Sequence, residues 1–290
     1  MTEKHTQSLM EIVNEQASSE YLKLPVFPGV ALELQSLLAD ENVPVERAAT
    51  VLSKDQALAS EILKMANSAF FSGLKRVKTI KDAIMRLGSN QVFNCLVCAG
   101  QQQFYKSPIP VLDKFLQISW KHALCMATGS KWLLQKIGYR ELSEEGFLAG
   151  LLHDIGKLLL LKVLETIHAD LDSQPSEEFI LELLDSMHVE QGYNLMKKWS
   201  IPTNYCNVVR DHHIENCDTT DVVLLAVRTV NQVCRRTGIA TNCDTQIVPA
   251  TLPEAHALGV KEIVLGELEV ILEDTLVAEF GPNHATARLH

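Results

Sequence analysis

An apolar stretch at residues 147–161 contains three ionisable side chains, those of His153, Asp154 and Lys157. Most of its other positions are leucine, isoleucine, alanine or phenylalanine, so a folded chain must bury the stretch in its core. Burying an imidazole, a carboxylate and an ammonium group costs several kcal/mol unless the groups are paired, hydrogen-bonded or bound to a metal. The fold must therefore bring partners for these three side chains into the core.

Apolar residues recur at helical spacing along most of the chain, and no segment shows the alternation typical of a half-buried strand. Pro44 suits the first position of a helix, Asp55 suits an N-cap, and Thr79 with Asp82 resembles a capping box. The expected helices span residues 8–17, 30–39, 44–52, 55–65, 79–87, 89–105, 111–137, 143–164, 176–199, 203–211, 221–237 and 261–280. The sequence thus predicts an all-α fold.

The segment Ser107-Pro108-Ile109-Pro110 marks a boundary, because its two prolines remove backbone donors and prevent a continuous helix. A chain of 290 residues, 47% of them hydrophobic, is long enough for two domains. We expect an N-terminal helical bundle at residues 1–107, packed on a C-terminal helical domain at residues 108–290. We interpret the last helix, residues 261–280, as a packing helix or a homodimer contact.

The overall charge and composition exclude several classes of protein. A net charge of -10 and a pI near 5.5 argue against nucleic-acid binding, which needs a basic face. A helix-turn-helix arrangement surrounds Gly88, but residues 90–105 carry no charged side chain with which to read DNA. The chain shows neither an N-terminal signal segment nor the ~20 apolar residues of a membrane span. Seven scattered cysteines indicate reduced thiols, so we expect a cytoplasmic protein.

Two smaller features have ordinary explanations that we favour. The basic residues Lys75, Arg76, Lys78 and Lys81 could receive a phosphate-containing ligand or an acidic partner, but such a run is more often a solvated loop. Cys95 and Cys98 form a C-x-x-C in an apolar helix, with no second pair at the spacing of a zinc site. We expect these cysteines to pack as small hydrophobic residues.

Residue types that bind metals gather in four places in the C-terminal half, namely His122, the pair His153-Asp154, His188 and the doublet His212-His213. A lone helical histidine is usually a core or surface residue, but five beside apolar helical patterns favour a metal site. Imidazole and carboxylate suit a divalent ion, and the sequence leaves iron, manganese and zinc open. Asp154 could bridge two ions that activate water to attack a phosphate ester, with Lys157 on the same helical face meeting the phosphate.

Taken together, the motifs resemble the HDOD family, the HD-related output domains of bacterial signalling proteins. The matching segments are Leu24-Pro25-Val26-Phe27-Pro28, Ser53-Lys54-Asp55, Ala66-Asn67-Ser68, Leu87-Gly88, Gly150-Leu151-Leu152-His153-Asp154-Ile155-Gly156-Lys157 and Trp199-Ser200-Ile201-Pro202. The resemblance to the wider HD phosphohydrolase superfamily implies metal ligands at His122, His153, Asp154, His188, His212 and His213. The resemblance to relatives that hydrolyse cyclic di-GMP implies that Lys157 lies near the phosphate of a substrate. HDOD proteins as a class, in contrast, resemble regulatory outputs that bind a signalling protein.

The sequence departs from the catalytic pattern of that superfamily. Asn231 stands at the best match for the last ligand aspartate, and a neutral amide is a poorer ligand for a hard cation. Ile118 replaces a glutamate of some relatives, and no Gly-Tyr-Pro follows the histidine doublet. We therefore favour a signalling output module with an incomplete metal site. The alternative is a metal-dependent phosphohydrolase acting on a nucleotide or other phosphate ester, with Asp154 and Lys157 as catalytic residues.

Overall fold

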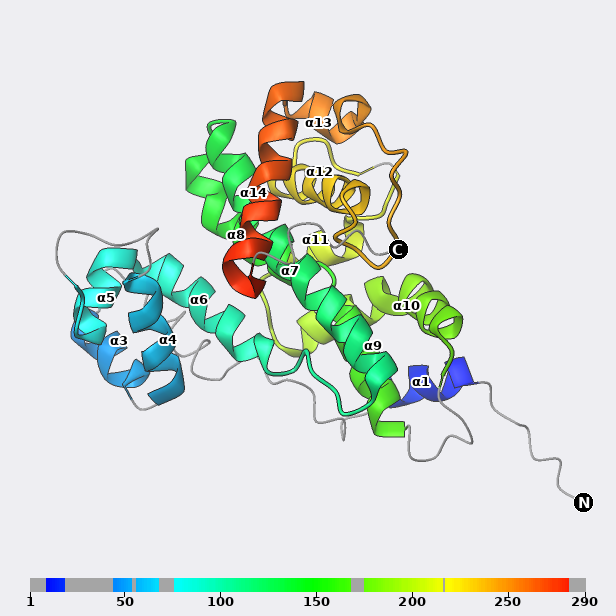
Figure 1. Ribbon diagram of the computed structural model, residues 1–290, viewed down its shortest axis with the longest axis horizontal. Coiled ribbons are helices and arrows are strands. Elements are labelled where there is room, and N and C mark those ends of the chain that lie inside the picture. Colours follow the sequence, from blue (N-terminus) through cyan, green and yellow to red (C-terminus); the bar gives the residue numbers. More distant parts are fainter. Residues whose placement is uncertain are drawn as a thin grey trace, which may run out of the picture. The chain divides into compact units, whose positions relative to one another are not determined.

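The computed structural model describes residues 9–18, 44–53, 56–67, 76–167, 175–215 and 217–281 (Figure 1). Every regular element in these ranges is a helix, which confirms the predicted all-α fold. The chain divides into two compact units, one formed by Pro25–Phe104 and the other by Met1–Leu24 with Tyr105–His290. None of the described helices combines the length and the apolar character needed to cross a membrane.

The smaller unit contains the helices α3 (Val45–Leu52), α4 (Gln56–Ala66), α5 (Ile80–Leu87) and α6 (Ser89–Gln102). Aliphatic side chains of these helices form its core, among them Leu52, Ile62, Ile84 and Leu96. The Thr79 hydroxyl accepts a hydrogen bond from the Asp82 backbone N–H, as expected at the start of α5. Pro44 is the N-cap of α3 and not its first residue. Asp55 and the helix expected at residues 30–39 lie outside the described residues.

The first helix, α1 (Leu9–Ser18), groups with the larger unit. Val13 is fully buried, and the Gln191 side-chain amide donates a hydrogen bond of 2.7 Å to the Asn14 side-chain oxygen. These contacts hold α1 against helices that come much later in the chain. The limits 1–107 and 108–290, and the packing of one domain on the other, stay predictions.

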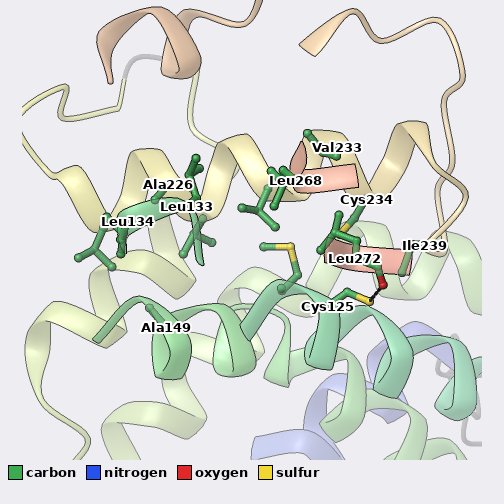
Figure 2. Packing of buried hydrophobic residues seen from close by; sticks show 14 of the residues in the cluster. Cys125, Leu133, Leu134, Ala149, Ala226, Val233, Cys234, Ile239, Leu268 and Leu272 are labelled. Carbon is green, nitrogen blue, oxygen red and sulfur yellow. Dashed lines mark hydrogen bonds between the residues drawn. The ribbon is translucent and has the colours of Figure 1, made fainter. Parts of the chain in front are cut away.

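Most of the larger unit is formed by the helices α7 (Pro110–Lys136), α8 (Ser143–Leu152), α9 (Ile155–Ile167), α10 (Glu177–Lys198), α11 (Thr203–Asp211), α12 (Val222–Arg236), α13 (Pro253–Ala257) and α14 (Glu262–Phe280). Helices α7, α12 and α14 pack on one another around a hydrophobic core (Figure 2). Leu268 and Leu272 of α14 are fully buried there, and the Cys125 thiol donates to the Leu272 carbonyl. The C-terminal helix thus completes the core of its own unit.

The apolar stretch forms two helices, α8 and α9, instead of the single helix expected at residues 143–164. The break falls at His153 and Asp154, which form the turn between them. Glycines allow close backbone packing on either side of this turn. A Cβ atom at Gly150 would lie 2.4 Å from the Met126 carbonyl oxygen of α7, and one at Gly156 would lie 1.9 Å from the His188 carbonyl oxygen of α10. The turn is therefore enclosed by α7 and α10.

Candidate metal centre

The larger unit brings all six proposed ligand residues into one cluster. Helix α7 carries His122, the turn between α8 and α9 carries His153 and Asp154, α10 carries His188, and the residues after α11 supply His212 and His213. Their ligand atoms form two overlapping groups that share Asp154, and within each group all atoms lie within 4.8 Å of one another. All of these residues are buried except His213. Their role as metal ligands stays a prediction.

Four of the histidines are oriented by hydrogen bonds from Nδ1 to a backbone carbonyl. A carbonyl oxygen can only accept, so Nδ1 carries the proton and Nε2 keeps its lone pair. Metal-ligating histidines in proteins usually show this arrangement. The pairs are His122 with Ile239 at 2.6 Å, His153 with Gly150 at 2.8 Å, His188 with Leu184 at 2.6 Å, and His212 with Val209 at 2.8 Å.

One of the two groups contains His188, His212 and His213 around the Oδ1 atom of Asp154, and we call it the Oδ1 side. Asp154 Oδ1 is 3.4 Å from His188 Nε2 and 3.5 Å from His212 Nε2. These three atoms are buried, and the described structure gives none of them a hydrogen-bond partner. Buried polar atoms without partners are rare and call for an explanation. Three imidazoles and one carboxylate that converge in this way fit a divalent ion such as zinc, iron or manganese.

On the Oδ2 side lie His122, His153 and Lys157. Asp154 Oδ2 is 3.5 Å from His122 Nε2, 3.4 Å from His153 Nε2 and 2.6 Å from the Lys157 Nζ atom. The two Nε2 atoms are 3.2 Å apart, and because both Nδ1 atoms carry protons, their lone pairs face each other. Neither Nε2 atom therefore receives a hydrogen bond from the other. Lys157 Nζ also lies 3.5 Å from the Thr241 hydroxyl.

Burial keeps the His122 and His188 imidazoles neutral, and the Asp154 carboxyl stays charged. Burial lowers the pKa of His122 to about 3 and that of His188 to about 3. Burial alone would raise the pKa of Asp154, but the Lys157 ammonium and the neighbouring imidazoles of His153 and His212 together outweigh it and hold that pKa well below its usual range. At neutral pH, His122 and His188 therefore offer neutral imidazoles beside a charged carboxylate, and these are the forms that bind metal ions.

A buried ion pair braces the histidine doublet, and sequence reasoning missed it. The Arg228 guanidinium on α12 donates to the backbone carbonyls of Asp211, His212 and Ile214 at 3.3, 3.0 and 2.7 Å. Its Nε atom donates to Glu254 on α13 at 2.7 Å. The only sequence signal was an arginine on the apolar face of a helix. Glu254, in the region after Ile239, thus supports the site through Arg228.

The other sequence candidates are Asn231, the basic residues of the smaller unit, Cys95 and Cys98. Asn231 is buried on α12, and its role as a degenerate ligand stays a prediction. In the smaller unit, Arg76 and Lys78 are exposed and line a hollow of about 480 Å³ together with Ser60, Leu63, Lys64, Asn67 and Val77. Lys81 pairs with Glu46 at 2.6 Å on the surface. Lys75 and the side chain of Cys95 lie outside the described residues, whereas Cys98 is half-buried.

Comparisons with known proteins agree with this fold. A family model of the HDOD domain matches residues 24–215. An uncharacterized protein of Treponema pallidum (strain Nichols) is 28% identical over 200 residues, which are 66% of this chain. The match spans 37% of the length of that relative.

Three solved structures share the fold at 20–24% sequence identity. An HDOD domain protein of unknown function from Geobacter sulfurreducens gives a TM-score of 0.72, with 93% of this chain and 97% of that chain covered. A provisionally named signal transduction protein from Marinobacter aquaeolei gives a TM-score of 0.67, with 89% of this chain and 59% of that chain covered. A provisionally named metal-dependent phosphohydrolase from Shewanella amazonensis gives a TM-score of 0.65, with 92% of this chain and 98% of that chain covered.

Proposed function

The chain belongs to the HDOD family, and on this premise we propose that it is a regulatory output module of a bacterial signalling system that binds a divalent metal ion. The observation that carries the metal site is the convergence of Asp154 Oδ1, His188 Nε2 and His212 Nε2, three buried atoms without hydrogen-bond partners. A metal ion would satisfy all three at once. The protein supplies no other group for them among the described residues.

The regulatory role rests on what surrounds this site. Asn231 stands at the best sequence match for the last ligand aspartate, and among the described residues Asp154 is the only carboxylate grouped with His122 and His153. No Gly-Tyr-Pro segment follows the histidine doublet, so hydrolysis of cyclic di-GMP has no support in the sequence. The Marinobacter aquaeolei relative, which shares the fold, is named for signal transduction. We infer a site that stabilises or reports a conformation and does not turn over a substrate.

The alternative function is a metal-dependent phosphohydrolase acting on a nucleotide or other phosphate ester. Six ligand residues assembled in one cluster, with Lys157 beside them, favour it. A bound metal would polarise a phosphoryl oxygen in such a reaction. Asp154 would then hold the metal, and Lys157 would supply the positive charge that meets the phosphate. The Shewanella amazonensis relative, named for this activity, supports the fold-level analogy.

Elemental analysis of the purified protein and a hydrolysis assay separate the two functions. The regulatory function predicts bound metal and no turnover of a generic phosphodiester with added manganese. The phosphohydrolase function predicts turnover of this phosphodiester, and His153→Ala and Asp154→Ala should each abolish that turnover. Absence of metal from protein purified without chelator, together with no binding on titration, would contradict both.

We also propose a protein partner and a homodimer. Helix α14 exposes Ile263 and Val270 while its opposite face packs into the core, so it offers apolar side chains for contact. A phosphate-containing ligand at Lys157 and a cytoplasmic location stay part of the proposal. Sedimentation of the wild type beside I263E/V270E tests the dimer, because the charged variant should be monomeric if this face forms it.

A further inference from the structure

The two sides of Asp154 differ in how their negative charge is compensated. On the Oδ2 side, the Lys157 ammonium lies 2.6 Å from the carboxylate oxygen, at the distance of a strong ion pair. On the Oδ1 side, no cationic group reaches the oxygen in the described structure, and Oδ1 has no hydrogen-bond partner. One half of the carboxylate is therefore satisfied by the protein, and the other half is not.

The two sides also differ in their number of ligands. The Oδ1 side offers four, from Asp154, His188, His212 and His213. The Oδ2 side offers only three, from His122, His153 and the shared Asp154. The residue expected to supply its fourth ligand is Asn231, a neutral amide. A second cation would thus meet a poorer ligand set and would have to displace an ammonium group from Asp154 Oδ2.

We propose that Lys157 replaces the second metal ion, so that the protein binds one divalent ion, on the Oδ1 side only. This inference rests on the metal binding proposed above. The lysine stays fixed because its carrier helix α9 is held against α10 at Gly156, and because Thr241 lies within reach of its Nζ atom.

A single ion on this side changes the chemistry that the site can perform. Four protein ligands fill the tetrahedral coordination of an ion such as zinc, and closed sites of this kind are structural, whereas catalytic zinc sites keep a position open. Hydrolysis by two ions that hold the attacking and leaving oxygens together requires both positions. Lys157 therefore gives a physical reason for a regulatory site in place of an enzyme.

Metal counting in paired variants tests the proposal. Each protein is dialysed against Zn²⁺, freed of excess, and its zinc content measured by elemental analysis. Wild type should hold one ion per chain. His188→Ala should lose it, with at least a tenfold weaker affinity, whereas His122→Ala should keep it, because each variant removes one imidazole from opposite sides of Asp154. Equal loss in both variants, or two ions in the wild type, overturns the inference.

A gain-of-site experiment tests the role of the lysine itself. The double variant Lys157→Met with Asn231→Asp removes the ammonium and restores a carboxylate, so it should hold two ions, and Mn²⁺ bound to it should show the paramagnetic resonance of a coupled pair. Lys162→Met is the matched control, because Lys162 lies on the same helix and pairs with Glu165 at the same 2.6 Å and sequence separation. The control should hold one ion.

The outcomes separate this inference from the proposed function. One ion in the folded double variant overturns the role of Lys157 while leaving the metal site intact. No ion in the wild type contradicts the proposed metal binding itself. If the double variant does not fold, the comparison of His188→Ala with His122→Ala still decides on which side the ion binds.

Discussion

Two clusters of ionisable side chains, one in each unit, differ in what holds them. The cluster around Asp154 in the larger unit is buried, and backbone carbonyls fix four of its imidazole rings. Arg76 and Lys78 in the smaller unit are exposed on the rim of a hollow, and Lys81 forms a surface ion pair. Water compensates the exposed charges, whereas the buried ones depend on protein partners. Burial therefore separates a candidate site from a solvated surface.

The two units that hold these clusters differ in net charge. The segment 25–104 has 8 Lys and Arg against 7 Asp and Glu, a net charge of +1. The rest of the chain has 18 against 29, since the totals are 26 and 36, a net charge of -11. The smaller unit is thus the less acidic part of an acidic protein. Arg76 and Lys78 nevertheless carry little structural energy, because they are exposed to water.

The largest expected difference between the clusters is their response to acid. In the folded, metal-free chain, His122 and His188 stay neutral down to about pH 3, whereas in the unfolded chain they take up protons near pH 6.5. Between these values the unfolded chain binds more protons, so the free energy of unfolding falls as pH decreases. Each ring contributes up to about 1.4 kcal/mol per pH unit. Urea denaturation from pH 7 to pH 4 measures the slope, and a flat profile would contradict it.

Asp154→Ala should have the next largest effect. It leaves the Lys157 ammonium buried without its carboxylate, which costs about 3–5 kcal/mol of unfolding free energy, and it removes a ligand from both sides. Chemical denaturation and metal titration measure the two losses. The double variant Asp154→Ala with Lys157→Met should recover part of the stability and none of the metal binding. Equal stability of the single and double variants would show that the ion pair is not responsible.

Arg228→Met should weaken the site from a distance. It removes the donors to the Asp211, His212 and Ile214 carbonyls and leaves Glu254 buried without its partner. We expect a loss of about 3 kcal/mol in stability and a metal affinity weakened about 10- to 100-fold.

The matched control for Arg228→Met is Lys131→Met, which breaks the half-buried ion pair with Glu144 in the same unit. Lys131→Met should lower the free energy of unfolding by less than about 1 kcal/mol and leave the metal affinity unchanged. Isothermal titration of both variants with Zn²⁺ provides the measurement. Unchanged affinity in Arg228→Met would show that the buried pair supports the fold without orienting the ligands.

The smallest effect is expected in the exposed cluster. Lys78→Ala removes an exposed side chain outside the core of the smaller unit, so the free energy of unfolding should change by less than about 0.5 kcal/mol. The zinc content should stay at the wild-type value. A large loss of stability in thermal denaturation would break the comparison, because it would show that this surface depends on protein partners too.

Local signals in the sequence predicted much of the fold. The Thr79 cap and most of the helical segments follow from hydrophobic spacing and cap residues, which act within a few positions of the chain. These signals did not predict the break between α8 and α9, because leucine-rich residues on both sides continue the helical pattern through it. They also did not predict that α1 groups with the larger unit, because Gln191, which donates a hydrogen bond to Asn14 of α1, lies far along the chain.

The sequence by itself determined which residue types could form a site, because the histidines and Asp154 stand among apolar residues that must be buried. Only the tertiary structure decided how they are used. It placed Lys157 on one oxygen of Asp154 and left the other without a partner, and it brought Arg228 and Glu254 together behind the doublet. Sequence spacing fixes the direction of a side chain along its own helix, but contacts between helices depend on how their backbones pack, as at Gly156 and His188.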